Sequence, residues 1–221
     1  MKTAFVFPGQ GSQYVGMAND FIQKDPALKE ILDNFDKAHN TNLAEVMASG
    51  PEEALKQTSY TQPAILFHSI SALYGFQNKS KLQADFVAGH SLGEFSALVA
   101  SEMITFQDAL HLVHKRGEFM IKANAGVPFA MSAIIGLEPN LVKEICSEAE
   151  SVGLVRAVNF NTPIQTVISG TAEGVQKAGE IAKAKGAKRV IPLVVGGPFH
   201  TPLIDKAKDW LMEEMRKVDF K

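Results

Sequence analysis

The stretch VAGHSLGEF at residues 87–95 decides the fold of this chain. A short apolar run, typical of a buried strand, stops at Gly89, and a helical pattern follows Gly93 at once. Ser91 therefore lies between two glycines at a predicted strand-to-helix turn, which is the sequence context of a nucleophile elbow. Glycines permit a sharp turn, and a helix N-terminus offers unpaired N–H groups to a developing negative charge. The alternative is a serine that caps the helix; we interpret Ser91 as the nucleophile.

The composition is that of a soluble globular protein. The 221 residues are 46% hydrophobic and 21% charged, and the net charge is −2, with no basic stripe that would suggest nucleic acid. Cys146 is the only cysteine, which excludes an internal disulfide and fits a reducing compartment. No apolar run has the length of a membrane span or of a secretory signal. We therefore expect a cytoplasmic protein that binds neither nucleic acid nor membranes.

The order of the predicted elements indicates an α/β fold with an insertion. Strands are predicted at residues 3–7 and 85–88, and helical patterns follow each, one of them starting at Pro63. Between residues 126 and 197 the pattern becomes strand, helix, strand, strand, helix, strand, which is the ferredoxin-like order. Residues 202–218 return to an amphipathic helix. The predicted domains are a larger α/β body, residues 1–125 and 198–221, and a ferredoxin-like subdomain, residues 126–197.

A serine nucleophile needs a general base, and the six histidines are the first candidates. His200 follows a predicted strand and a Gly-Gly-Pro turn, a loop position that suits a site, so we interpret it as the base; a structural histidine is the alternative. His90 adjoins Ser91 and is interpreted as pocket lining. His111 and His114 have a spacing that can hold a metal, but without a third ligand we interpret them as surface residues.

Arg116 lies on the apolar face of a helix predicted at residues 107–122. It is four residues from both Leu112 and Met120, which belong to the inward stripe. A guanidinium in such surroundings needs an anion to offset its desolvation. The pattern leaves two interpretations open: an ion pair with a protein carboxylate such as Glu94, or a clamp for a substrate carboxylate.

The turn GQGSQ at residues 9–13 also follows a predicted strand. It is not a phosphate loop, because Met17 and Ala18 stand where Lys and Ser or Thr are required. It is not a dinucleotide fingerprint either, because Tyr14 replaces the third glycine. We interpret the turn as one that presents backbone N–H groups beside Ser91; a purely structural turn is the alternative.

Six separated motifs together resemble one family. The motifs are FVFPGQGSQ at 5–13, TQPAILFHS at 61–69, GHSLGEFSAL at 89–98, KRGEFM at 115–120, QTVISG at 165–170 and PFHTPL at 198–203. With these motifs the chain is similar to the malonyl-CoA:acyl carrier protein transacylases of fatty-acid synthesis and to the acyltransferase domains of polyketide synthases, and the resemblance covers its whole length. It implies an α/β-hydrolase-like body with an inserted ferredoxin-like subdomain.

The resemblance implies an activity and a set of roles. Ser91 takes a malonyl group from malonyl-CoA, with His200 as general base, and passes it to the phosphopantetheine thiol of acyl carrier protein in a ping-pong reaction. Arg116 holds the free carboxylate of malonate. No metal or redox cofactor is implied, and we expect a monomer. The other implied site residues are Gln10 and Leu92, whose backbone N–H groups form the oxyanion hole, and His90, Asn159 and Phe199, which line the pocket.

Two further implications concern Phe199 and the end of the chain. Phe199 precedes the catalytic histidine as in malonyl-selective members, so we expect it to disfavour a branched methylmalonyl unit. The family continues past the PFH motif with a strand, helices and a backbone carbonyl that orients the histidine, so we expect this chain to be C-terminally truncated.

Two other functions stay open at this point. A serine esterase or thioesterase would lose its acyl group to water. A non-catalytic fragment that binds the carrier protein would be indifferent to Ser91→Ala.

Overall fold

The computed structural model describes residues 2–124 and 126–221, and the chain divides into two compact units. We describe each unit by itself. No helix within the described ranges is both long and apolar enough to cross a membrane. The first unit spans Met1–Glu118 and Leu211–Lys221, and the second spans Phe119–Trp210.

The boundaries of these units differ from the predicted domain boundaries, which enclose residues 126–197 as the inserted subdomain. Phe119 and Met120 precede the predicted insertion, and Phe199 follows it, yet all three belong to one hydrophobic cluster of the second unit. The change in hydrophobic pattern along the sequence indicates where strands begin and end. It does not report which core the flanking helical residues join, because a helix can pass from one core to the next.

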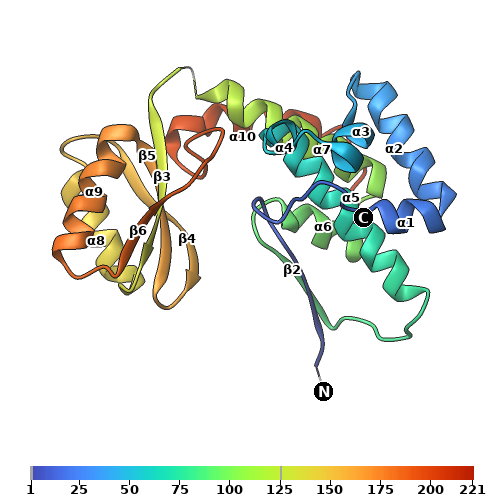
Figure 1. The fold of residues 1–221 in the computed structure, drawn as a ribbon, viewed down its shortest axis with the longest axis horizontal. Helices are drawn as coiled ribbons and strands as arrows, with labels where there is room; N and C mark the ends of the chain where they lie inside the picture. Colours follow the sequence, from blue (N-terminus) through green and yellow to red (C-terminus); the bar gives the residue numbers. More distant parts are fainter. Residues whose placement is uncertain (1, 125) are drawn as a thin grey trace. The chain divides into compact units, whose positions relative to one another are not determined.

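The first unit is largely helical and contains one pair of strands (Figure 1). The strands run parallel and are joined through helices, as parallel strands require. Its elements are β1 (Ala4–Phe7), α1 (Asn19–Lys24), α2 (Pro26–His39), α3 (Leu43–Ser49), α4 (Glu52–Leu55), α5 (Thr58–Gln77), β2 (Phe86–Gly89), α6 (Gly93–Ala100), most of α7 (Phe106–Ala123) and the end of α10 (Asp205–Met215).

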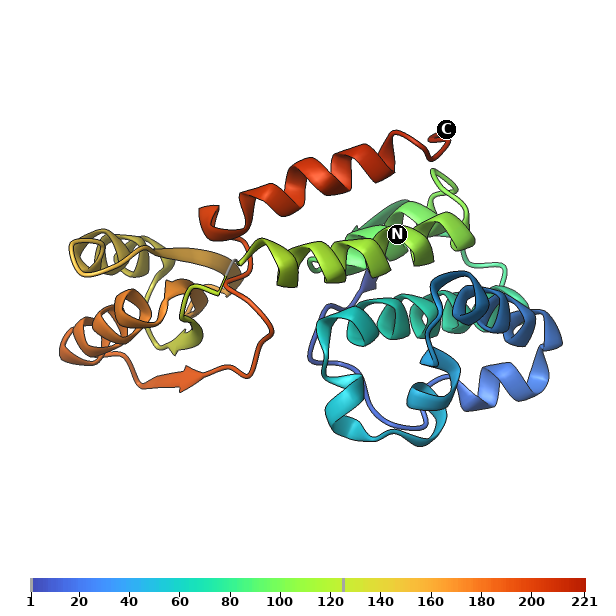
Figure 2. The same cartoon turned by 90° about the horizontal axis from the view of Figure 1, so that it is seen from above.

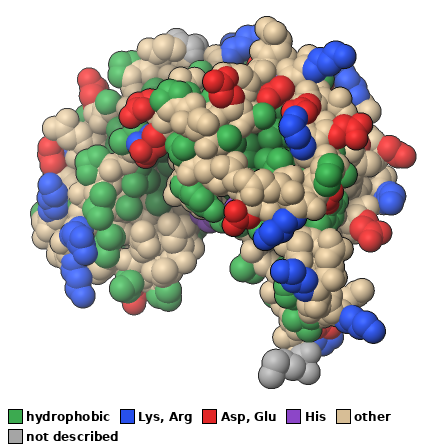
Figure 3. All heavy atoms as spheres, turned by 45° about the vertical axis from the view of Figure 1, so that its right-hand side comes forward, with side chains coloured by type: hydrophobic (Ala, Val, Ile, Leu, Met, Phe, Trp, Pro, Cys, Tyr) green, Lys and Arg blue, Asp and Glu red, His purple; other side chains and the backbone are tan. Residues whose placement is uncertain are grey.

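The two faces of the β1–β2 pair differ in burial. Phe7 is buried in the main core, and Phe5 and Val87 pack against the same core. Val6 and Phe86 alternate with them and face outward, with 74% and 61% of their surface exposed. Figure 3 shows hydrophobic side chains at the surface of this region. The helices of the first unit therefore cover one face of this parallel pair.

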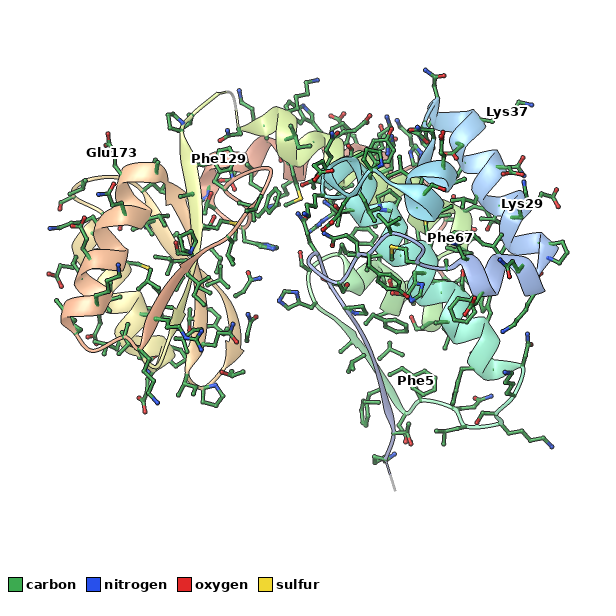
Figure 4. The ribbon with its side chains drawn as sticks, viewed as in Figure 1. Phe5, Lys29, Lys37, Phe67, Phe129 and Glu173 are labelled. Carbon is green, nitrogen blue, oxygen red and sulfur yellow. The ribbon has the colours of Figure 1, made fainter. Side chains whose placement is uncertain are left out.

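The helix α5 forms the centre of the first unit. Its buried residues lie on all sides of the helix, as expected of a helix surrounded by others, and Phe67 is fully buried. Figure 4 shows Phe67 among the helices, whereas Lys29 and Lys37 of the peripheral α2 point outward. The prediction that Pro63 starts this helix was wrong, because α5 begins at Thr58 and contains Pro63. Burial on all sides offsets the single backbone hydrogen bond that proline cannot make.

The second unit contains an antiparallel four-stranded sheet in the order β4-β5-β3-β6. Ile134, Val155 and Ile168 project from one face of the sheet and pack under the two helices α8 and α9, which lie side by side (Figures 1 and 2). Its elements are β3 (Phe129–Ile135), α8 (Pro139–Ala149), β4 (Val155–Thr162), β5 (Gln165–Thr171), α9 (Ala172–Ala184), β6 (Arg189–Pro192) and a short 3₁₀ turn (Pro202–Ile204) before α10.

Three histidines of the first unit form a cluster that the sequence did not predict. His39, at the end of α2, contacts two histidines of α7: its Nε2 lies 3.4 Å from Nδ1 of His111, and its ring centroid lies 4.6 Å from that of His114. His114 is only 4% exposed, so its interpretation as a surface residue was wrong. The cause is tertiary, because the end of α2 packs on α7 and covers a position that helical spacing alone assigned to solvent.

Burial disfavours protonation of two of these histidines, His39 and His114. The pKa of His39 falls from 6.5 to about 4, first through burial and then through the neighbouring His114, His111 and Lys115, although Glu118 acts in the opposite direction. Burial also lowers the pKa of His114. The folded unit therefore holds the rings of His39 and His114 neutral in a pH range where the unfolded chain binds protons.

We predict that acid destabilises the first unit and that His39→Gln weakens this effect. The lowered pKa means that the stability contributed by neutral His39 is complete above pH 6.5 and is lost as the pH falls toward 4. Urea unfolding across this range measures the slope of the unfolding free energy against pH. That slope should be smaller in His39→Gln, because the unfolded variant binds one proton fewer. An identical slope in both proteins would assign the acid sensitivity to other groups.

Candidate active site

Ser91 occupies a tight turn between β2 and α6. Its φ angle is 54°, in the left-handed region that side chains other than glycine rarely adopt. Backbone hydrogen bonds close the turn: the N–H of Gly93 donates to the carbonyl of His90 at 3.0 Å, and the N–H of Glu94 donates to the carbonyl of Ser91 at 3.2 Å. The predicted strand-to-helix turn is therefore present, with a strained backbone at the predicted nucleophile.

The two glycines on either side of Ser91 make this turn possible. A Cβ atom on Gly89 would lie 1.9 Å from the carbonyl carbon of Gly93 and 2.0 Å from its oxygen. A Cβ atom on Gly93 would lie 2.4 Å from the carbonyl oxygen of Phe7 in β1. Because all of these neighbours are backbone atoms, they cannot rotate away. The absence of side chains at both positions lets the strand and the helix approach closely enough to form the elbow.

The turn that contains Gln10 lies beside this elbow. Phe7 pairs with Gly89 at the ends of two parallel strands, and the carbonyl of Phe7 accepts a hydrogen bond from the N–H of His90 at 3.0 Å. A Cβ atom on Gly9 would lie 2.5 Å from the carbonyl oxygen of His90. The first unit therefore brings the turn after β1 against the turn after β2, as the parallel pairing requires. Leu92 of the elbow is buried.

Arg116 of α7 reaches the elbow. Its Nη2 donates a hydrogen bond to Oγ of Ser91 at 3.0 Å, and its Nη1 donates to Oε1 of Gln62 at 2.7 Å. Gln62 lies on α5 and is 1% exposed. Sequence reasoning assigned no role to Gln62, although one signal was available: it is a long polar residue directly before the apolar run at residues 63–67.

The charged guanidinium of Arg116 forms its hydrogen bonds with neutral groups. Burial lowers the pKa of Arg116 to about 10, and the charge of Glu94 opposes this shift. Within the described ranges, the guanidinium makes hydrogen bonds with neutral Gln62 and Ser91 rather than a salt bridge with Glu94. Of the two interpretations from the sequence, the protein ion pair with Glu94 is therefore wrong. A cation next to the candidate nucleophile has the chemistry to attract an anionic group there.

The second unit carries the other three predicted residues. His200 is exposed and has a φ angle of 63°, again in the left-handed region. Phe199 beside it is 7% exposed and belongs to the hydrophobic core, and Thr201 Oγ1 donates to the carbonyl of Pro198 at 2.7 Å. Asn159 lies on β4, next to an irregularity in its pairing with β5. The loop around His200 is thus fixed on both sides of an exposed histidine.

A serine on a strained elbow between a parallel strand and a helix is typical of α/β proteins that use serine as a nucleophile. The neighbouring guanidinium is typical of sites that recognise carboxylates. Comparison with known proteins agrees with this class. Residues 4–220 match the family described as "Acyl transferase domain". The chain therefore belongs to the acyl transferase domain family.

Three relatives illustrate the similarity. The chain is 45% identical over 221 residues to the malonyl CoA-acyl carrier protein transacylase of Bacillus subtilis, covering 100% of this chain and 69% of that protein. A crystal structure of acyl-carrier-protein S-malonyltransferase from Burkholderia pseudomallei is 46% identical with a TM-score of 0.92, covering 100% and 72% of the two chains. A malonyl-transacylase in complex with its type II polyketide acyl carrier protein is 39% identical with a TM-score of 0.93, at the same coverage.

We predict that Gly89→Ala prevents the elbow from forming. The new Cβ atom would overlap backbone atoms of Gly93, so the strand and α6 must separate, at a cost of more than about 3 kcal/mol. The measurement is the free energy of unfolding in urea. Gly179→Ala in α9 is the control, because its nearest neighbour is a side-chain atom of Val190 at 3.2 Å. If both variants were equally stable, the contact with Gly93 would not constrain the fold.

Proposed function

We propose that this chain transfers a malonyl group from malonyl-CoA to the phosphopantetheine thiol of acyl carrier protein, through an acyl intermediate on Ser91. The observation that carries the proposal is the hydrogen bond from Arg116 to Oγ of Ser91. This contact supports a site in which a cation binds a second carboxylate beside a nucleophile that attacks a thioester. Acetyl groups lack that carboxylate, whereas malonyl groups possess it. The relatives named malonyl transacylases support the same substrate.

The reaction divides into two transfers that use the same groups. Ser91 Oγ attacks the thioester carbonyl of malonyl-CoA while His200 accepts the hydroxyl proton. The backbone N–H groups of Gln10 and Leu92 stabilise the resulting oxyanion. When the carbon–sulfur bond breaks, coenzyme A leaves and takes the proton from His200. The carrier-protein thiol then attacks the acyl-serine, with its proton passing to His200, and Ser91 regains its hydrogen when the ester bond breaks.

Arg116 provides the selection for malonate in this proposal. Its guanidinium is buried enough to lower its pKa but has neutral hydrogen-bond partners, Gln62 and Ser91. A malonyl carboxylate would give it a charged partner, and a bidentate pair of this kind is about twice as strong as a neutral one. His90 and Asn159 line the acyl pocket, and Phe199 disfavours a branched acyl unit.

The finer description of the fold belongs to the same proposal. The first unit is the α/β-hydrolase-like body, and the second unit is the ferredoxin-like subdomain, supported by its strand order β4-β5-β3-β6 and its two helices on one face. The chain works as a monomer in the cytoplasm and without a metal or redox cofactor. Acyl carrier protein is its partner, as the complex of a similar malonyl-transacylase with a carrier protein supports.

The test of the acyl-serine is intact-protein mass spectrometry after brief mixing with malonyl-CoA. The unaltered chain should gain one malonyl group, and acyl carrier protein should remove it. Ser91→Ala should gain none, because the oxygen that forms the ester is absent. His200→Ala should gain it more slowly by roughly 10² to 10⁴-fold, because proton transfer is lost.

Three outcomes would contradict this function. An adduct that persists in Ser91→Ala would place the nucleophile elsewhere. An adduct that water removes as fast as acyl carrier protein does would identify a hydrolase. Binding of acyl carrier protein without any adduct on the folded, unaltered chain would identify a non-catalytic carrier-protein-binding module.

We predict that Arg116→Ala lowers the rate of malonyl loading about a hundredfold or more, because a half-buried charged hydrogen-bond partner of the carboxylate is lost. Acetyl loading should change far less. Arg116→Lys should be intermediate, because it keeps the charge and loses the two-pronged geometry. The measurement is the rate of acyl-enzyme formation from each thioester. Equal losses for malonyl and acetyl groups would refute the carboxylate clamp.

A further inference from the structure

The helices α5 and α7 touch at a glycine that immediately follows Arg116. A Cβ atom on Gly117 would lie 2.8 Å from the carbonyl oxygen of Thr58, 3.1 Å from Cα of Ser59 and 3.2 Å from the carbonyl carbon of Thr58. All three are backbone atoms in the first turn of α5. Thr58 is itself 1% exposed and Ser59 is half-buried, so the turn is covered at the point where it meets Gly117.

This contact and the hydrogen bonds of Arg116 join the same two helices. Gln62 lies four residues after Thr58, one turn further along α5, and accepts the 2.7 Å hydrogen bond from Nη1 of Arg116. The second hydrogen bond, from Nη2 to Ser91, is 3.0 Å long. N–H···O bonds keep their strength over only a few tenths of an ångström. One guanidinium therefore meets both partners only within a narrow range of separations between α7 and α5.

Any side chain at residue 117 would change that separation. Ordinary contacts of a Cβ atom with backbone atoms lie above 3.4 Å, so a contact at 2.8 Å with Thr58 requires α7 to move by roughly half an ångström. The movement occurs one residue from Arg116 and carries its backbone away from α5. Close packing of the surrounding core transmits such a displacement rather than absorbing it.

We propose that Gly117 is a positioning residue for malonyl selectivity. Its lack of a side chain sets the distance between α5 and α7 at which Arg116 reaches Gln62 and Ser91 together. It thereby holds the guanidinium where the carboxylate of an acyl-serine arrives. This inference rests on the proposed function, since it gives a structural cause for the selection that Arg116 performs. Gly117 itself contacts neither the acyl group nor the thioester.

The test is Gly117→Ala in the full chain, with malonyl-CoA and acetyl-CoA as the two probes. The rate of acyl-enzyme formation from malonyl-CoA should fall by roughly tenfold to a hundredfold, the loss that follows a small misplacement of a binding group. The rate from acetyl-CoA, which has no second carboxylate, should stay within about twofold. The ratio of the two rates is the readout, because a general loss of folding lowers both rates together and leaves the ratio unchanged.

The matched control is Gly75→Ala, in the same helix α5. It makes the same glycine-to-alanine change inside a helix of the same unit, but its Cβ atom meets only the ring of Phe21, at 3.2 and 3.4 Å. A side-chain ring can shift where backbone cannot. Gly75→Ala should therefore keep the ratio of the unaltered chain.

The outcomes separate this inference from the proposed function. If Arg116→Ala loses malonyl selectivity and Gly117→Ala keeps it, the positioning role is wrong and the clamp stands. If Gly117→Ala lowers both rates equally together with the unfolding midpoint, the residue is only structural and the inference is overturned. If the unaltered chain forms no acyl-enzyme, or Arg116→Ala keeps its selectivity, the proposed function fails and this inference fails with it.

A second variant covers the case in which Gly117→Ala does not fold. Gln62→Asn leaves the contact between the helices intact and draws the amide oxygen back by one carbon–carbon bond, about 1.5 Å. The hydrogen bond from Arg116 would then exceed its normal length, so the ratio of malonyl to acetyl loading should fall. An unchanged ratio in a folded Gln62→Asn protein would show that the α5–α7 separation does not control selectivity, which overturns the proposal.

Discussion

The close approach of β2 to the first turn of α6 is the constraint on which the rest of the first unit's site depends. Gly89 and Gly93 bring two backbone segments into contact, and the chain between them must turn so sharply that Ser91 adopts a left-handed conformation. The same Gly93 lies against the carbonyl of Phe7, so β1 is held at the elbow as well. Strain at a single serine is retained because the surrounding backbone leaves no other path.

The electrostatics of this site follow from where α7 places the half-buried cation of Arg116. The guanidinium of Arg116 loses part of its hydration and instead donates hydrogen bonds to Gln62 and Ser91, neither of which carries charge. Its pKa falls in consequence, although it stays protonated at neutral pH. A guanidinium whose hydrogen-bond partners are neutral is only partly compensated for its desolvation. This partial compensation is the basis of the proposed clamp for an acyl carboxylate.

One helix serves three neighbours along its length. His111 and His114 of α7 contact the end of α2, Gly117 contacts the start of α5, and Arg116 extends to the elbow. The position of α7 is therefore fixed by packing on two sides, and this packing also fixes the position of the Arg116 guanidinium. Hydrophobic periodicity divides the residues of α7 into inward and outward sets, but it cannot say which helix each inward residue meets.

The sequence by itself determined the local features of this protein. The elbow around Ser91 was predictable because its strand, glycines and helix are adjacent in the chain, and local backbone sterics decide such a turn. The strand and helix order of the second unit followed from periodicity for the same reason. Arg116 was recognised as unusual because Leu112 and Met120, four residues to either side of it, belong to the apolar face of its own helix.

Only the tertiary structure decided which residues contact Arg116 and the clustered histidines. Gln62 and Ser91 lie 54 and 25 residues from Arg116, and their contact depends on how α5, α6 and α7 pack. The cluster around His39 and the buried position of His114 arise from the packing of α2 on α7. Periodicity reports which face of an element is buried. The identity of its neighbour is a long-range property, set by the shape and volume of the whole core.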